Sequence, residues 1–131
     1  MKANERIALD SSAVILYFRG HPAARELLGA AQEIYLPLTA VGELYLGVER
    51  AEQKMKRRRE LDELLALTNV LHPNLQTAQF YAQMKARLLT AGKPIPDNDI
   101  WIAALAQQAG LPLAARDEHF DFIEGLEVIG L

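Results

Sequence analysis

The sequence lacks cysteine, has only three histidines and contains no long uninterrupted apolar run. Without cysteine, a disulfide scaffold and any zinc site built on thiolates are excluded. No apolar stretch approaches the roughly 18 residues that a membrane-spanning helix needs. The first six residues also lack the apolar core of a signal peptide. From these absences we expect a cytoplasmic protein that does not associate with membranes.

A strong excess of charge of one sign is also missing. The chain has 14 Lys and Arg against 17 Asp and Glu, which gives a net charge of −3. A protein with this balance does not hold nucleic acid by bulk attraction, so a polyanionic partner would need a local basic patch or a bound cation. The 50% hydrophobic content excludes a disordered chain. The 131 residues carry no linker or internal repeat, and we expect one domain over residues 1–131.

Short apolar runs alternate with longer segments of helical periodicity. The runs predict strands over residues 6–10, 33–36, 69–71, 111–114 and 127–129. The segments between them predict helices over residues 12–18, 23–31, 39–52, 54–67, 75–90 and about 99–109. Thr39 is the expected cap of the third helix, and Gly92 and Gly110 are expected to end the last two. Because no tight hairpin turn joins the strands, we predict an α/β fold, a three-layer α/β/α sandwich around a central, mainly parallel sheet.

Four acidic residues occupy informative places on this scaffold. Asp10 and Asp117 each follow a predicted strand, and open parallel sheets bind ligands beyond the carboxyl ends of their strands. Asp99 lies in the first turn of a predicted helix, and Glu43 lies one turn into another. Each acid alone is explained as a helix cap or a solvated helix residue. Their joint placement favours a catalytic site over four separate caps, because at least two of the acids lie at the same edge of one sheet.

Four segments, in order along the chain, resemble the motifs of PIN-domain ribonucleases. They are LDSSAVI at 9–15, TAVGELYLG at 39–47, PDNDIWIAA at 96–104 and LAARDEHF at 113–120. The length is similar to that of the VapC-type toxins of prokaryotic toxin–antitoxin pairs. The sequence departs from the family pattern at Ala115, where the family has Thr or Ser, so the fine geometry around Asp117 stays open. The motif favours Asp99 over Asp97 as the inward acid, with Asp97 as a cap or an outer-sphere ligand.

The resemblance implies a metal-dependent endoribonuclease with Asp10, Glu43, Asp99 and Asp117 as its catalytic residues. Clustered carboxylates repel one another, and their oxygen atoms suit Mg²⁺ or Mn²⁺. Asp10, Asp99 and Asp117 would hold the metal, and Glu43 would bind it through water or orient the attacking water.

The resemblance also implies partners. These are an RNA substrate, a second copy of the chain in a homodimer, and a VapB-like antitoxin whose C-terminal segment would lie across the acidic pocket and insert an Arg or Lys. The alternative is a non-catalytic PIN-like module that binds RNA or protein without cutting.

For each of three further features of the sequence, two interpretations are open. The basic run Lys54, Lys56, Arg57, Arg58 and Arg59 is either a solvated helix face, with pairs Lys56–Glu60 and Arg58–Asp62, or a track for an RNA backbone. The hydroxyl of Ser12 either caps a helix or binds a carboxylate or phosphate. His119 either makes a structural hydrogen bond in the turn before Phe120 or contacts the substrate.

Overall fold

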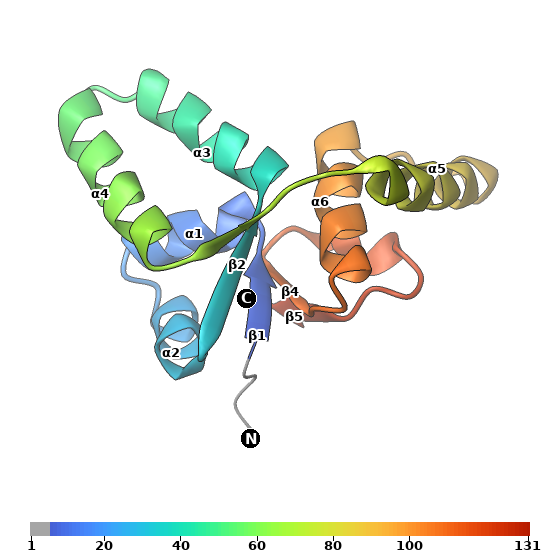
Figure 1. Ribbon diagram of the computed structural model, residues 1–131, viewed down its shortest axis with the longest axis horizontal. Coiled ribbons are helices and arrows are strands. Elements are labelled where there is room, and N and C mark those ends of the chain that lie inside the picture. Colours follow the sequence, from blue (N-terminus) through green and yellow to red (C-terminus); the bar gives the residue numbers. More distant parts are fainter. Residues whose placement is uncertain (1–5) are drawn as a thin grey trace.

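The computed structural model describes residues 6–131, so the first five residues, where we expected no targeting segment, lie outside the described residues. The elements follow one another as in Figure 1. They are β1 (Arg6–Leu9), α1 (Ser11–Phe18), α2 (Pro22–Ala30), β2 (Glu33–Pro37), α3 (Leu38–Glu49), α4 (Lys54–Ala66), β3 (Asn69–Leu71), α5 (Leu75–Thr90), α6 (Asp97–Gln108), β4 (Leu113–Ala115), the short 3-10 helix η1 (Glu118–Phe122) and β5 (Val128–Gly130).

The five strands form one parallel sheet in the order β3-β2-β1-β4-β5. The central strand β1 pairs with β2 on one side, where Ala8 lies opposite Tyr35, and with β4 on the other, where Ala8 lies opposite Leu113. The chain therefore leaves β1 toward one edge of the sheet and later returns to its other side. Such a reversal opens a crevice at the carboxyl ends of the two strands, here β1 and β4.

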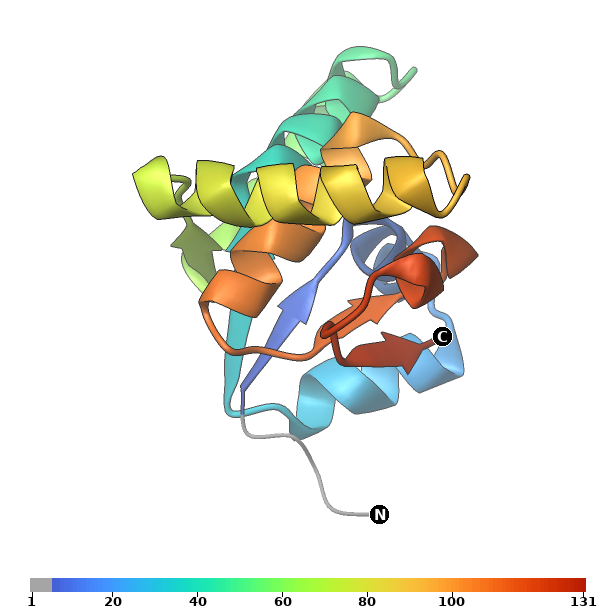
Figure 2. The ribbon, with the colours of Figure 1, turned by 90° about the vertical axis from the view of Figure 1, so that its right-hand side faces the viewer.

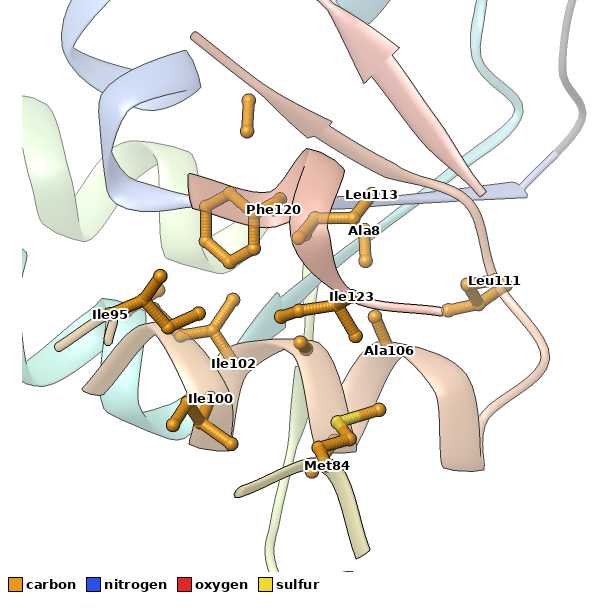
Figure 3. Close-up of a cluster of buried hydrophobic side chains, with 14 of the residues drawn as sticks. Ala8, Met84, Ile95, Ile100, Ile102, Ala106, Leu111, Leu113, Phe120 and Ile123 are labelled. Carbon is orange, nitrogen blue, oxygen red and sulfur yellow. The ribbon is translucent and has the colours of Figure 1, made fainter. Parts of the chain in front are cut away.

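Helices cover both faces of the sheet, which confirms the predicted three-layer α/β/α architecture. Alternate residues of β1 point to opposite faces: Ile7 and Leu9 belong to one buried cluster with α1–α4, and Ala8 belongs to the other with α5 and α6. Figure 2 looks onto the face covered by α5 and α6. Figure 3 shows the cluster beneath these helices, in which the fully buried Phe120 of η1 packs near Ile102 and Leu113. Phe120 thus anchors the turn that follows β4 to the core.

The predicted strands and helices are all present, with bounds that agree for β3 and α5 and differ by at most three residues elsewhere. The largest error concerns the third helix, because Thr39 is not its cap and the helix ends at Glu49 instead of residue 52. β2 runs directly into α3 through Pro37, so the helix begins one residue before Thr39 and no side chain caps it. β4 also lies nearer to Asp117 than predicted, since Leu111 and Pro112 belong to the connection from α6.

Glycine ends α6 as predicted. Gly110 has a positive φ of 68°, a conformation that costs glycine little, and the next backbone N–H, of Leu111, donates to the carbonyl of Ala106 at 3.0 Å. This tight end directs the chain into β4. Among residues 6–131, no helix combines the length and apolar character needed to cross a bilayer.

Candidate active site

The four predicted acids come from four different elements and lie at the carboxyl-end edge of the sheet. Asp10 directly follows β1 and Asp117 lies two residues after β4, so both flank the crevice between these neighbouring strands. Glu43 lies on α3, which follows β2, and Asp99 lies in the first turn of α6. The helices α1, α3 and α6 begin near this edge (Figure 1), and their N-terminal ends favour negative charge there.

Asp10 is buried, with 4% of its surface exposed, and of the two roles considered for the Ser12 hydroxyl the structure shows the contact to a carboxylate, because the cap of α1 is Asp10 itself. The backbone N–H of Ser12 donates to Asp10 Oδ2 at 3.3 Å, which caps α1. The Ser12 hydroxyl donates to the same Oδ2 at 2.7 Å and accepts the backbone N–H of Arg116 at 3.1 Å. The Ser12 side chain therefore connects the end of β1 to the turn that carries Asp117.

Glu43 is held beside Asp10 by the other serine. The hydroxyl of Ser11 lies 3.2 Å from Glu43 Oε1 and 3.5 Å from Asp10 Oδ1. Burial raises the pKa of the Glu43 carboxyl, the Ser11 hydrogen bond lowers it, and the charges of Asp10 and Asp99 raise it further. Glu43 therefore lies within the electrostatic field of the other acids.

Asp99, Asp117 and His119 form the densest part of the cluster. One possible ligand atom from each of the three lies within 4.8 Å of the others. The ring Nδ1 of His119 lies 2.9 Å from Asp99 Oδ2 and 3.0 Å from Asp117 Oδ1, and the backbone N–H of His119 donates to Asp117 Oδ1 at 2.9 Å. Burial raises the pKa of Asp99, the hydrogen bond from His119 lowers it, and the charges of Asp10 and Asp117 raise it again.

This donor set fits a hard divalent cation. Within residues 6–131, no Lys or Arg forms an ion pair with any of the four acids, and the basic group beside them is the His119 ring, whose pKa the hydrogen bond to Asp99 raises. Carboxylate oxygens dominate the set, as Mg²⁺ and Mn²⁺ prefer, and the hydrogen bond that Asp10 Oδ1 makes within the described part of the chain is the long one from Ser11 at 3.5 Å. Asp99 and Asp117, two of the three predicted metal ligands, lie together with His119 in one close group, whereas Asp10 is not part of that group among the described residues and reaches Asp99 through the effect of its charge.

Asp97 points away from this cluster. Its Oδ1 accepts hydrogen bonds from the hydroxyl of Tyr81 at 3.0 Å and from the Lys85 ammonium at 2.9 Å, both on α5. These partners lower the pKa of Asp97, with the Lys85 hydrogen bond as the largest cause. Asp97 does not cap α6 either, because Pro96 stands at the cap position without a side-chain hydrogen bond. The motif-based preference for Asp99 as the inward acid agrees with this geometry.

The hydroxyl missing at position 115 would lie on a buried side chain of the core. Ala115 is almost fully buried and packs in the cluster beneath α5 and α6. Asp117 is oriented from its other side, by the backbone and ring of His119. The departure from the family pattern therefore removes one hydroxyl without leaving Asp117 free to rotate.

Two participants were not identified as such from the sequence. His119 lies two residues after a predicted acid in the sequence, yet its ring contacts to Asp99 and Asp117 depend on α6 packing over the turn after β4. Ser11 was not singled out, because its contact to Glu43 spans 32 residues of the chain. Both residues lie close in sequence to a predicted acid. This proximity alone does not show whether a side chain contacts the acids of the site.

The basic run lies on α4, where several of its charges are paired. Arg58 pairs with Asp62 at 3.4 Å as predicted, whereas Glu60 pairs with Arg57 at 3.0 Å instead of with Lys56. Lys54 pairs with Glu49 at 3.7 Å. These exposed pairs support the interpretation of α4 as a solvated helix face.

A hollow of about 460 Å³ lies beside the acids, between α1, α3 and α4. Its lining is mainly apolar and includes Phe18, Leu44 and Leu61. Glu43 also lines it, so the hollow reaches the acid cluster, and Arg19 and Arg57 add positive charge to its wall.

Comparisons with known proteins agree with this fold and site. The family model of the PIN domain matches residues 7–126. Ribonuclease VapC2 from Haemophilus influenzae is 30% identical over 113 residues, covering 83% of this chain and 84% of that protein. Ribonuclease VapC5 from Mycobacterium tuberculosis is 26% identical over 119 residues, covering 89% and 87%.

Solved structures show the same fold. VapBC2 from Rickettsia felis, bound to a DNA fragment from its promoter, superimposes with a TM-score of 0.87 at 20% identity, covering 96% of this chain and 98% of that one. FitAcB from Neisseria gonorrhoeae gives a TM-score of 0.82 at 29% identity, covering 94% and 96%. The chain therefore belongs to the PIN-domain family and, within it, to the VapC-type proteins.

Proposed function

We propose that this chain is an endoribonuclease that hydrolyses RNA phosphodiester bonds with the help of Mg²⁺ or Mn²⁺, and that it is the toxin of a toxin–antitoxin pair. The observation that carries the proposal is the convergence of Asp10, Glu43, Asp99 and Asp117 from four elements at one sheet edge, with no Lys or Arg of residues 6–131 paired to them. The relatives named ribonuclease support the reaction class.

Asp10, Asp99 and Asp117 are the proposed metal ligands. When bound, a divalent cation supplies activation of water and neutralisation of charge on the phosphate. It also makes an acidic pocket compatible with a polyanionic substrate.

Glu43 has a different proposed task. The Ser11 hydroxyl fixes one carboxylate oxygen of Glu43 at 3.2 Å, and an ionised carboxylate held in place in this way can act as a general base. We assign Glu43 the orientation of the attacking water and the acceptance of its proton.

The test is cleavage of RNA by the purified chain in Mn²⁺, compared between wild type and Asp10→Asn. Asp97→Asn is the matched control, because Asp97 is an acid of the same neighbourhood that points toward α5. We expect Asp10→Asn to lose at least about a hundredfold in rate, as expected when a charged site group is removed, and Asp97→Asn to stay close to wild type. Equal rates for wild type and Asp10→Asn would refute the assignment, and the absence of cleavage by wild type would favour the non-catalytic binding module.

We propose a VapB-like antitoxin as the physiological partner. The similar solved structures include VapBC2 from Rickettsia felis and VapBC-1 from nontypeable Haemophilus influenzae. The apolar hollow between α1, α3 and α4 would receive an apolar segment of the antitoxin, and Glu43 at its border would attract a basic side chain from it.

Gly47 offers a clean test of this surface. It lines the hollow, is exposed, and a Cβ added there meets no atom within 4 Å, so Gly47→Arg would fill the hollow without disturbing the core. Gly29→Arg on α2 is the matched control, since Gly29 is equally unobstructed and does not line the hollow. We expect Gly47→Arg to abolish co-purification with the antitoxin and Gly29→Arg to retain it. If both variants co-purify with the antitoxin, the hollow is not the antitoxin-binding surface.

We also propose that the chain forms a homodimer. Leu46 on α3 is 57% exposed and Met55 on α4 is 80% exposed, so both leave apolar surface that the chain's own core does not use. Analytical ultracentrifugation should show a dimer for wild type and a monomer for Leu46→Glu. A wild-type monomer at tens of micromolar would contradict the proposal.

A further inference from the structure

The chain contains only two serines, and they stand side by side at the candidate site as Ser11 and Ser12. Both hydroxyls contact acids of the cluster, and each one also reaches a segment distant in sequence. Neither hydroxyl is needed to cap α1, because the backbone N–H of Ser12 already donates to Asp10. Both hydroxyls are therefore available to donate hydrogen bonds to the acids of the cluster.

The Ser12 hydroxyl is the middle of a hydrogen-bonded chain. The Arg116 N–H donates to the Ser12 oxygen at 3.1 Å, and the Ser12 O–H donates to Asp10 Oδ2 at 2.7 Å. Accepting one hydrogen bond polarises a hydroxyl and strengthens the one that it donates. The chain couples the buried carboxylate after β1 to the backbone next to Asp117.

The Ser11 hydroxyl has one proton and two possible acceptors. Glu43 Oε1 at 3.2 Å is the closer one, and Asp10 Oδ1 at 3.5 Å lies at the limit of a hydrogen bond. Donation to Glu43 leaves Asp10 Oδ1 available to a cation, while Asp10 Oδ2 stays held by Ser12. The two oxygens of Asp10 therefore have different tasks.

We propose that the two serines are positioning residues with separate effects: Ser12 orients Asp10 relative to the turn carrying Asp117, and Ser11 orients Glu43. The inference rests on the proposed nuclease function. It follows that Ser12 acts on metal affinity, whereas Ser11 acts on the rate of the chemical step and leaves metal affinity intact.

The test measures Mn²⁺ binding by titration calorimetry and RNA cleavage as separate kcat and KM values. The variants are Ser12→Ala, Ser11→Ala and the hydroxyl-retaining Ser12→Thr and Ser11→Thr. Thr68→Val is the control for hydroxyl loss elsewhere, because Thr68 precedes β3 and bonds only the carbonyl of Leu65 in the described structure. Thermal melting checks that each variant is folded.

We expect Ser12→Ala to bind Mn²⁺ about tenfold more weakly, as is typical when a group that orients a metal ligand is lost, and Ser12→Thr to stay within about twofold of wild type. We expect Ser11→Ala to lose about tenfold in kcat with KM and Mn²⁺ affinity nearly unchanged, and Ser11→Thr to restore the rate.

Two results would overturn the inference. One is a wild type that binds Mn²⁺ and cleaves RNA while both alanine variants match it. The other is a Ser12→Thr variant that loses as much Mn²⁺ affinity as Ser12→Ala, which would assign the loss to packing and not to the hydroxyl. A wild type that neither binds Mn²⁺ nor cleaves RNA would instead reject the proposed function, and the positioning roles with it.

Discussion

Replacing Asp99 with Asn should stabilise the metal-free protein while removing its response to Mn²⁺. Asp99 lies close to Asp117 and has an exposed side-chain fraction of 13%. The ligand atoms of this group lie within 4.8 Å of one another, and two unit charges at that upper limit repel by about 1 kcal/mol in a water-like medium and by more in a less polar one. The Asn side chain has the same shape as Asp and can still accept a hydrogen bond from the His119 ring. We therefore expect the free energy of unfolding to rise by about 1 kcal/mol, which corresponds to a melting temperature about 4 °C higher.

The pH dependence has a definite sign. Burial, followed by the charges of Asp10 and Asp117, raises the pKa of Asp99 in the folded state. The protonated carboxyl is therefore favoured by folding, and its contribution to stability is present at low pH and lost as the pH rises through the raised pKa. The stability advantage of Asp99→Asn should be absent in acid, where wild-type Asp99 is also neutral, and should reach its full size at neutral pH.

The assay is thermal unfolding at pH 7, first in EDTA and then with Mn²⁺ at about 100 times its Kd. Mn²⁺ at that concentration should stabilise wild type by about 2.7 kcal/mol and leave Asp99→Asn nearly unchanged. Asp97→Asn is the matched control in the same helical turn. Asp97 has a lowered pKa and bonds Lys85 and Tyr81, so its Asn variant should melt slightly lower than wild type and keep the Mn²⁺ response.

The reasoning would be refuted by an Asp99→Asn variant that melts below wild type in EDTA. That result would mean that the hydrogen bond from His119 to the ionised carboxylate outweighs the repulsion among the acids. A full Mn²⁺ response in Asp99→Asn would likewise remove Asp99 from the proposed ligands.

Three further predictions concern other parts of the molecule. Replacing Arg57, Arg58 and Arg59 together with Gln should leave the salt dependence of RNA binding unchanged, because Arg57 and Arg58 are paired within α4; a slope of log K against log salt flatter by about 2 would identify an RNA track. Phe120→Ala should cost about 3–5 kcal/mol in urea denaturation because Phe120 is fully buried, whereas the half-exposed Phe122 should tolerate alanine. Asn74→Ala should remove the capping box of α5 and cost about 1 kcal/mol without changing Mn²⁺ affinity.

Much of the fold could be predicted because its signals are local. The apolar run before Asp10, the helical spacing over α5 and the glycine after α6 depend on residues close together in the chain. The parallel arrangement followed from the lack of hairpin turns between the strands. Local signals were weakest where two elements join directly: at Pro37 no polar cap separates β2 from α3, so the start of that helix was misplaced.

The sequence by itself predicted which acids would lie together at the edge of the sheet, because their types and spacing lie within motifs that can be recognised in the chain. Only the tertiary structure decided how those acids are held. Ser11 meets Glu43 across 32 residues and Ser12 meets Arg116 across 104, and the direction of Asp97 depends on α5 packing against α6. A hydrogen bond requires its two atoms to lie about 3 Å apart at a suitable angle. Such proximity between distant segments is set by the packing of the whole sheet and its helices, which no short segment of sequence records.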